Sequence, residues 1–206
     1  LYRALGSDGA SVLGYASSSD GFRIDERHET PVYAPSAPYE LPAATRERQH
    51  FPPISYSSGG GGNGGCEDPR LARIEDTVYM TYAAFNGWNS VRMTLTSIDL
   101  DDFRKKQWKW KKPLLLSAEG EIHKNWVLFP EKIKGKYAIL HSIAPEILIE
   151  YVDEFNEYAA PIQSPYPKIA CAGLWEENIR GAGPPPLKTK YGWLLLYHAI
   201  EKKDPG

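Results

Sequence analysis

Two adjacent acidic residues, Glu67 and Asp68, lie between a glycine tract and a proline, in the stretch GGNGGCEDPR that ends at Arg70. The residue before a proline is biased toward an extended backbone, so we expect Asp68 to be extended. Successive side chains of an extended chain point to opposite sides, and one of the two carboxyl groups would then face a ligand site. The alternative is that both acids pair with Arg70 and Arg73 and serve only the structure.

Three basic residues lie in surroundings that could also serve a ligand. Arg92 interrupts an apolar strand predicted over 90–98, where a charge is costly unless something requires it. Lys124 lies between polar and aromatic residues in EIHKNWVLFP, and His198 ends the apolar run GWLLLYH. Each has an ordinary explanation: a surface arginine, a lysine that extends its amine to solvent, or a hydrogen-bonded core histidine. Together beside one of the acids, they would make an anion site.

Short strands are the elements available to position these residues. Apolar residues nowhere recur with helical spacing over a dozen positions, and 17 prolines and 18 glycines interrupt the chain throughout. The sequence is therefore predicted to be all-β. Runs rich in Val, Ile, Tyr, Trp and Thr predict strands at 77–84, 90–98, 137–143, 147–152 and 192–200.

An internal repeat indicates how these strands are arranged. Three segments share a proline, a short strand, a tight turn and an apolar strand; Tyr82, His141 and His198 occupy the same place in them, about 60 residues apart. A second match aligns 11–20 with 90–99. Such repeats favour a β-propeller, whose innermost strands deliver residues to the mouth of a central channel. A β-sandwich is the alternative, and the repeat in register weighs against it.

The composition is that of one folded domain, residues 1–206, with 42% apolar and 24% charged residues. A net charge of −2 provides no field that would draw the chain to nucleic acid or to an anionic membrane, and we expect neither as a partner. Cys66 and Cys171 lack the spacing of a metal site, and the five histidines form no HxH or HExxH motif. We therefore expect no metal, and a reducing, cytoplasmic location.

Two further segments have alternative explanations. Residues 41–65 form a glycine-rich insertion that lacks the Lys and Ser/Thr of a phosphate-binding P-loop; we favour a surface loop over a lid that closes on a substrate. Residues 103–112 combine basic residues with two tryptophans, which could stack on a single-stranded nucleic acid or hold an acidic polymer. We favour a solvated hairpin tip there.

Four motifs, taken in order, resemble glycoside hydrolase family 130. They are GCEDPR (65–70), HKNWVLFP (123–130), GAGPPPLKT (181–189) and LLLYHA (194–199), and residues 1–21 resemble that family's first blade. The resemblance implies a five-bladed β-propeller, mostly found as inverting β-mannoside phosphorylases. It also implies that this chain lacks part of the first and last blades.

The resemblance further implies roles for individual residues. Asp68 would be the general acid that protonates the glycosidic oxygen, while Arg92, Lys124 and His198 would hold phosphate. The implied substrate-binding residues are Arg3, Glu67, Arg70 and Asn125. No cofactor is implied, because inorganic phosphate is the co-substrate. The partner would be a β-mannoside of the manno-oligosaccharide or mannosyl-glucose type, and association into a homo-oligomer stays open.

Chemical requirements agree with a phosphorylase. Inverting hydrolysis needs two carboxyl groups about 6.5–9.5 Å apart, with a water between them. Phosphorolysis needs one acid, because phosphate is itself an anionic nucleophile that basic residues can hold. We expect release of α-mannose 1-phosphate, with burial raising the pKa of Asp68. The alternatives are an inverting β-mannosidase and a non-catalytic carbohydrate-binding propeller fragment.

Overall fold

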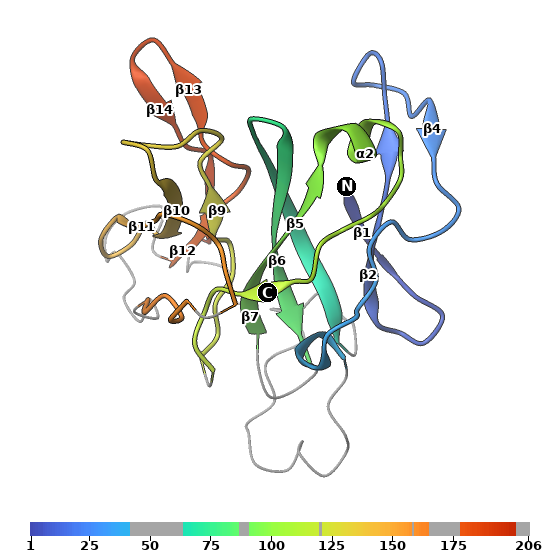
Figure 1. The fold of residues 1–206 in the computed structure, drawn as a ribbon, viewed down its shortest axis with the longest axis horizontal. Coiled ribbons are helices and arrows are strands. Elements are labelled where there is room, and N and C mark those ends of the chain that lie inside the picture. The colour runs from blue at the N-terminus through green and yellow to red at the C-terminus, as the bar shows by residue number, and fades with distance from the viewer. Residues whose placement is uncertain (42–63, 87–90, 120, 158, 165–177, 201–206) are drawn as a thin grey trace.

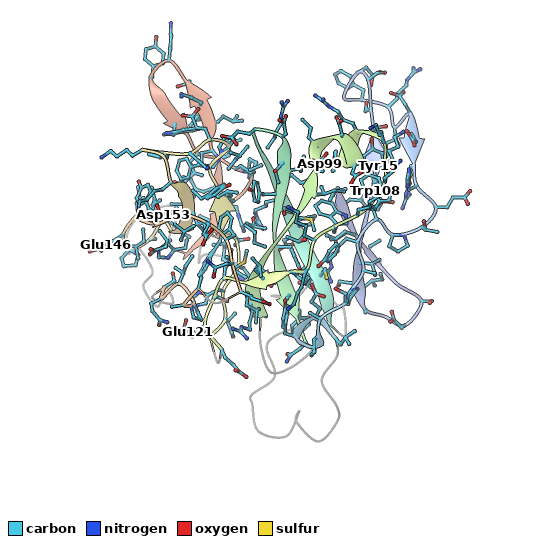
Figure 2. The ribbon with its side chains drawn as sticks, viewed as in Figure 1. Tyr15, Asp99, Trp108, Glu121, Glu146 and Asp153 are labelled. Carbon is cyan, nitrogen blue, oxygen red and sulfur yellow. The ribbon has the colours of Figure 1, made fainter. Side chains whose placement is uncertain are left out.

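The computed structural model describes residues 1–41, 64–86, 91–119, 121–157, 159–164 and 178–200, and within these ranges the protein is built almost wholly of strands (Figure 1). The helical elements described are a single turn of 3-10 helix, η1 (Pro38–Glu40), and a short helix, α2 (Leu100–Arg104). The side chain of Asp99 caps α2 by accepting a hydrogen bond from the backbone N–H of Asp101 (Figure 2). The predicted all-β class is confirmed.

The largest sheet has six strands, in the order β1-β2-β5-β6-β7-β8. Their bounds are β1 (Tyr2–Leu5), β2 (Ser11–Gly14), β5 (Gly65–Ile74), β6 (Thr77–Phe85), β7 (Val91–Asp99) and β8 (Leu114–Leu115). Neighbours are antiparallel except β2 and β5, which meet in parallel at Ser11 and Gly65. The predicted strands at 77–84 and 90–98 are confirmed as β6 and β7.

The remaining strands form smaller sheets. Among the described residues, three strands lie in the order β11-β10-β9, and three pairs of strands form two-stranded sheets, β12-β15, β13-β14 and β3-β4. Their bounds are β3 (Ala16–Ser17), β4 (Glu26–Arg27), β9 (Val127–Leu128), β10 (Tyr137–Ser142), β11 (Leu148–Val152), β12 (Asn178–Ala182), β13 (Leu187–Thr189), β14 (Gly192–Leu194) and β15 (Tyr197–Ile200). Strands β9 to β15 lie on the other side of β5, β6 and β7 from β1 and β2 (Figure 1).

One predicted strand is wrong in its continuity. Residues 192–200 form two strands, because β14 pairs with β13 whereas β15 pairs with β12. At the break, the backbone N–H of Gly183 donates to the carbonyl oxygen of Leu196 at 2.8 Å. A change of partner therefore divides a run whose residues are suited to a strand on both sides of the break.

Apolar clusters cover both faces of the sheet around β6. Met93, Trp126 and Ile139 belong to a cluster on one face, and Leu13 and Tyr82 belong to a cluster on the other. Continuous apolar sequence is typical of a strand that is buried on both faces, which explains the run YMTYAAF. The core thereby holds β5, which carries the two acids, between two layers of side chains.

The basic and aromatic segment 103–112 uses its tryptophans for packing. The indole N–H of Trp110 donates to the carbonyl oxygen of Val32 at 2.9 Å, and that of Trp108 to Nδ1 of His28 at 3.3 Å. The ring of Trp108 also lies 5.2 Å from that of Tyr15, centroid to centroid (Figure 2). These contacts hold the segment against residues 15–32, and the predicted solvated hairpin tip is wrong for the two tryptophans.

The glycine-rich insertion predicted at 41–65 lies almost wholly outside the described residues. Its last residue, Gly65, is the first residue of β5. Cys66 is buried and free, and Cys171 lies outside the described residues. In the part of the chain that the structure describes, no helix is long and apolar enough to cross a membrane.

Candidate active site

Asp68 lies in a β-bulge of strand β5. Glu67 pairs with Ala83 and Arg70 pairs with Thr81, so the ladder shifts register across Asp68 and Pro69. Asp68 has a φ of 51°, in the left-handed region, and the predicted extended backbone is therefore wrong. The register of β6 imposes the bulge and overrides the local preference before a proline. Such a backbone costs about 1–3 kcal/mol and persists only where its surroundings enforce it.

Arg70 supplies part of this enforcement. Its Nη1 donates to the carbonyl oxygen of Asp68 at 2.9 Å, its Nη2 to Oδ1 of Asn125 at 2.6 Å, and its Nε to the carbonyl oxygen of Gly183 at 2.7 Å. These bonds join the bulge to the segments that precede β9 and follow β12. Burial lowers the pKa of Arg70, and the charge of Asp68 opposes that shift.

Asn125 is fixed by a close backbone contact as well as by Arg70. It has a φ of 66°, and its Nδ2 donates to the carbonyl oxygen of Arg180 at 2.5 Å. Gly181 lies directly against it, with a φ of 122°, and a Cβ added there would be 2.7 Å from Cβ of Asn125. Only glycine allows this approach of β12, which explains the first glycine of the motif GAGPPP.

Four of the predicted site residues line one pocket of about 600 Å³, namely Asp68, Arg70, Asn125 and His198. Pro184 and Pro185 contribute to its wall. Burial lowers the pKa of His198, and the cations Arg70 and Arg180 lower it further. His198 is therefore neutral near pH 7, and it pairs with Gly181 across β12 and β15.

A second group of charged side chains surrounds Glu67, the residue before Asp68. It consists of Glu67, Arg3 and Lys124. Glu67 is 1% exposed; its Oε1 lies 3.1 Å from Nη2 of Arg3 and its Oε2 lies 3.5 Å from Nζ of Lys124. Burial raises the pKa of Glu67, whereas both cations lower it. The alternative pairing with Arg70 and Arg73 is wrong for Glu67, because its cationic partners come from β1 and from the segment before β9.

Arg92 lies apart from these two groups. Arg92 of β7 pairs with Ala84 of β6, and Ala84 pairs with Cys66 of β5, so these three residues share one face of the sheet. Glu67 pairs with the next residue of β6, Ala83. Arg92 therefore lies on the other face of the sheet from Glu67. Its Nη2 donates to the carbonyl oxygen of Ser117 at 2.7 Å, and it does not line the pocket.

Ser11 belongs to the second group and was not predicted as a site residue. Its hydroxyl donates to Oε1 of Glu67 at 3.3 Å and accepts from Nε of Arg3 at 3.0 Å. The repeat places Ser11 in register with Ser90, which marks it as a structural position without indicating its partners. In the described ranges, no three or more His, Cys, Asp or Glu residues gather as metal ligands do.

The fold and the site together define an all-β protein in which a carboxyl group, an arginine, an asparagine and a neutral histidine line one pocket. Residues 1–205 match the family model described as beta-1,4-mannooligosaccharide phosphorylase. The chain belongs to this family, glycoside hydrolase family 130.

Two curated relatives come from Thermoanaerobacter sp. (strain X514). A 1,2-beta-oligomannan phosphorylase is 34% identical over 199 residues, which is 94% of this chain and 55% of the relative. A beta-1,2-mannobiose phosphorylase is 30% identical over 194 residues, 94% of this chain and 54% of the relative. The chain thus spans about half the length of these relatives.

Solved structures share the fold. A glycosyl hydrolase from Bacteroides ovatus superposes with a TM-score of 0.64 at 21% identity, covering 97% of this chain and 56% of the other. A second structure has a TM-score of 0.62 at 23% identity and covers 96% of this chain and 55% of the other. Its description states that the GH130 family of mannoside phosphorylases contains hydrolases that target beta-1,2 mannosidic linkages in Candida mannan.

Proposed function

We propose that this chain carries the acid side of the active site of an inverting β-mannoside phosphorylase. The observation that carries the proposal is Asp68, a carboxyl group held in a strained bulge at the wall of a pocket that His198 also lines. The family and the names of its curated relatives support this function. The substrate would be a manno-oligosaccharide or a mannosyl-glucose, with inorganic phosphate as co-substrate and no cofactor.

In the proposed reaction, Asp68 gives its proton to the glycosidic oxygen as the bond from that oxygen to the anomeric carbon breaks. A phosphate oxygen attacks the anomeric carbon from the opposite face and supplies the electron pair of the new bond. The β-mannoside thereby becomes α-mannose 1-phosphate, and the rest of the sugar leaves with a new hydroxyl group. Asp68 must be protonated when the reaction begins.

Phosphate needs cationic and hydrogen-bonding partners as it approaches the oxocarbenium-like centre. We propose Lys124 and His198 for this role, together with Arg92. Arg92 lies on the other face of the sheet from Glu67 and donates to the carbonyl oxygen of Ser117. For Arg92 to bind phosphate, the phosphate site must extend toward that face of β7. Substrate contacts are proposed for Arg3 and Asn125.

Glu67 and Arg70 were also predicted to bind substrate, and their surroundings suit indirect roles better. The hydrogen bonds of Arg70 run to oxygens of Asp68, Asn125, Ala182 and Gly183, so we propose that it holds the acid in place. Glu67 is 1% exposed, pairs with two cations and does not line the pocket, so its carboxylate is not accessible to a ligand there.

We further propose that the chain is one domain, residues 1–206, and part of a five-bladed β-propeller that acts in the cytoplasm. The four antiparallel neighbours β5 to β8 have the form of a propeller blade, and β5 is the strand that carries the acid. A blade's inner strand presents its residues at the channel, which suits the place of Asp68. Association into a homo-oligomer stays open.

The test is the product formed by the full-length protein from β-mannosyl disaccharides, with and without inorganic phosphate. Mannose 1-phosphate that forms only with phosphate, and is lost in Asp68→Asn, would support the phosphorylase. The second candidate is an inverting β-mannosidase, favoured by the description of one similar structure. Free mannose formed regardless of phosphate would support that candidate, and binding of the disaccharide without any product would support a non-catalytic protein.

A further inference from the structure

Glu67 and Asp68 are neighbours with opposite surroundings. Asp68 lines the pocket, whereas Glu67 is 1% exposed and does not line it. A carboxylate that is buried so fully loses several kcal/mol of hydration unless partners compensate it. Glu67 therefore needs the cations beside it, and a direct contact with substrate cannot explain its presence in the motif.

The partners of Glu67 come from segments far apart in the sequence. Arg3 lies on β1, Ser11 on β2, and Lys124 just before β9, while Glu67 itself lies on β5. Strands β1 and β9 lie on either side of β5 (Figure 1). One carboxylate thus pairs with two cations that come from segments on either side of β5.

The contacts give each cation a defined position. Arg3 donates from Nε to the hydroxyl of Ser11 and places Nη2 beside Oε1 of Glu67, and the Ser11 hydroxyl donates to the same Oε1. Two hydrogen bonds and one ion pair make this ring and orient the guanidinium group. Nη2 of Arg3 is buried and makes no hydrogen bond among the described residues. The second oxygen, Oε2, lies 3.5 Å from Nζ of Lys124. Two cations and one carboxylate leave a net positive charge of one in this group, whose carboxylate belongs to the residue next to the proposed acid.

We propose that Glu67 is a positioning residue for anion binding: it orients Lys124 toward phosphate and holds Arg3 beside the adjoining sugar, without itself touching phosphate. This inference rests on the proposed function. Glu67→Gln keeps the shape of the side chain but removes its negative charge. Either the NH₂ group or the uncharged amide oxygen must then face Lys124. The cations lose the charge that holds them together, and their mutual repulsion moves them apart. Phosphate then meets a looser and less complementary site.

The test is the affinity of the full-length protein for inorganic phosphate, measured by calorimetric titration at pH 7.5. Such a titration needs no turnover. Glu67→Gln is expected to raise the Kd for phosphate by at least about tenfold, and to raise the KM for phosphate more than it lowers kcat. The matched control is Glu40→Gln, because Glu40 is also a buried carboxylate but is held by Tyr33 and Tyr82. Glu40→Gln should lower stability and leave the Kd unchanged.

A double-mutant cycle separates positioning from a general structural role. If Glu67 acts through its cations, the effect of Glu67→Gln on the Kd must shrink in the Lys124→Gln or the Arg3→Gln background. The same factor in all three backgrounds would overturn the proposal, as would a Kd equal to that of the unsubstituted protein.

Where Glu67→Gln fails to fold, or binding in a background is too weak to measure, Ser11→Ala opens the same ring. Ser11→Ala removes one hydrogen bond to a charged group, so it must raise the Kd for phosphate several-fold. An unchanged Kd would again overturn the proposal. If the unsubstituted protein itself fails to bind phosphate, the proposed function is what fails.

Discussion

Arg70 holds the carbonyl oxygen of Asp68 at 2.9 Å from its Nη1, directly at the bulge where the backbone of Asp68 is left-handed. The same guanidinium group reaches Asn125 and Gly183. A side chain two residues away therefore ties the proposed acid to a segment more than a hundred positions along the chain. The position of the acid thus depends on contacts that the neighbouring sequence does not contain.

Arg70→Lys should lower kcat more than it changes either KM. An ammonium group cannot reproduce the planar fork that serves four acceptors at once, so Asp68 loses its fixed position. A displacement of about 1 Å in a catalytic group can cost about 100-fold in rate, and we expect a fall of about 10- to 100-fold. Steady-state kinetics with both substrates measure it. The control is Arg73→Lys, because Nε of Arg73 donates to the carbonyl oxygen of Glu75 on an exposed side. An unchanged kcat in Arg70→Lys would contradict the positioning role.

Asp68→Asn should abolish most activity and leave the fold intact. Asparagine cannot donate the proton that a carboxylic acid donates, and loss of a general acid typically costs about 10²- to 10⁴-fold in rate. Asparagine also tolerates a left-handed backbone better than most residues do. The melting temperature of the variant should therefore stay within a few degrees of the original. A fully active Asp68→Asn protein would exclude Asp68 as the acid.

Gly181→Ala should destabilise the protein by at least about 2 kcal/mol, because the new methyl group would lie 2.7 Å from Cβ of Asn125 in a backbone region that alanine avoids. Chemical denaturation gives the free energy of unfolding. Gly192→Ala is a matched control: Gly192 has the same φ of 122°, and no atom lies within 4 Å of the position that its new methyl group would take. The difference between the two variants isolates the steric cost. Equal losses would mean that the contact with Asn125 contributes nothing.

Tyr82→Phe should lower the free energy of unfolding by about 1–3 kcal/mol. Glu40 is fully buried, and its carboxylate accepts hydrogen bonds from the hydroxyls of Tyr33 and Tyr82. Removing one hydroxyl leaves a buried charge with one donor fewer. Thermal unfolding measures the loss. Tyr79→Phe provides the comparison, because the hydroxyl of Tyr79 pairs with that of Tyr137 in a partly buried position and is expected to cost less. A larger loss in Tyr79→Phe would contradict the importance of the Glu40 network.

Phosphate should raise the pKa of His198. In the free protein, burial and the cations Arg70 and Arg180 lower this pKa, so the imidazole is neutral near pH 7. A bound anion favours the charged form, and His198 would then take up a proton as phosphate binds. NMR titration of the histidine rings with and without phosphate measures the shift. His141 is the internal reference, because burial also lowers its pKa and it does not line the pocket. An unmoved His198, or an equal shift at His141, would exclude His198 from the phosphate site.

The pKa of His198 is lower in the folded chain than in the unfolded chain, and this difference makes stability depend on pH. The unfolded chain binds a proton at His198 more readily than the folded chain does, so stability rises with pH across the window between the two pKa values. The contribution of His198 is therefore present above the ordinary histidine range near pH 6.5 and is lost as the pH falls below it.

Local sequence patterns predicted the strands well where both faces of a strand are buried. The run of apolar and β-branched residues at 77–84 became β6 because core clusters cover it from both sides. The break between β14 and β15 was missed, because the residues on both sides of it are equally suited to strands. Only the change of partner from β13 to β12 divides them, and a pairing partner is not a local property.

The candidate site shows the same division. The types and order of the acid and the basic residues pointed to Asp68 and His198, and the family resemblance implied Asn125. All three line one pocket. The backbone of Asp68 was mispredicted, because the preference before a proline is an average that the register of β6 overrides. Arg92 was grouped with the others by its residue type, whereas the alternation of side chains along β7 puts it on the other face of the sheet.

The segment between Glu40 and Gly64 begins and ends at clamped positions. Glu40 is held by two tyrosines at one end, and at the other the backbone N–H of Ser11 donates to the carbonyl oxygen of Gly64 at 2.7 Å. A side chain on Gly65 would meet the backbone of Ser11, which leaves β5 one way to enter the sheet. The two anchors therefore act as fixed mounting points: they set how β5 joins β2 and β6, and with it the register in which Glu67 and Asp68 are presented.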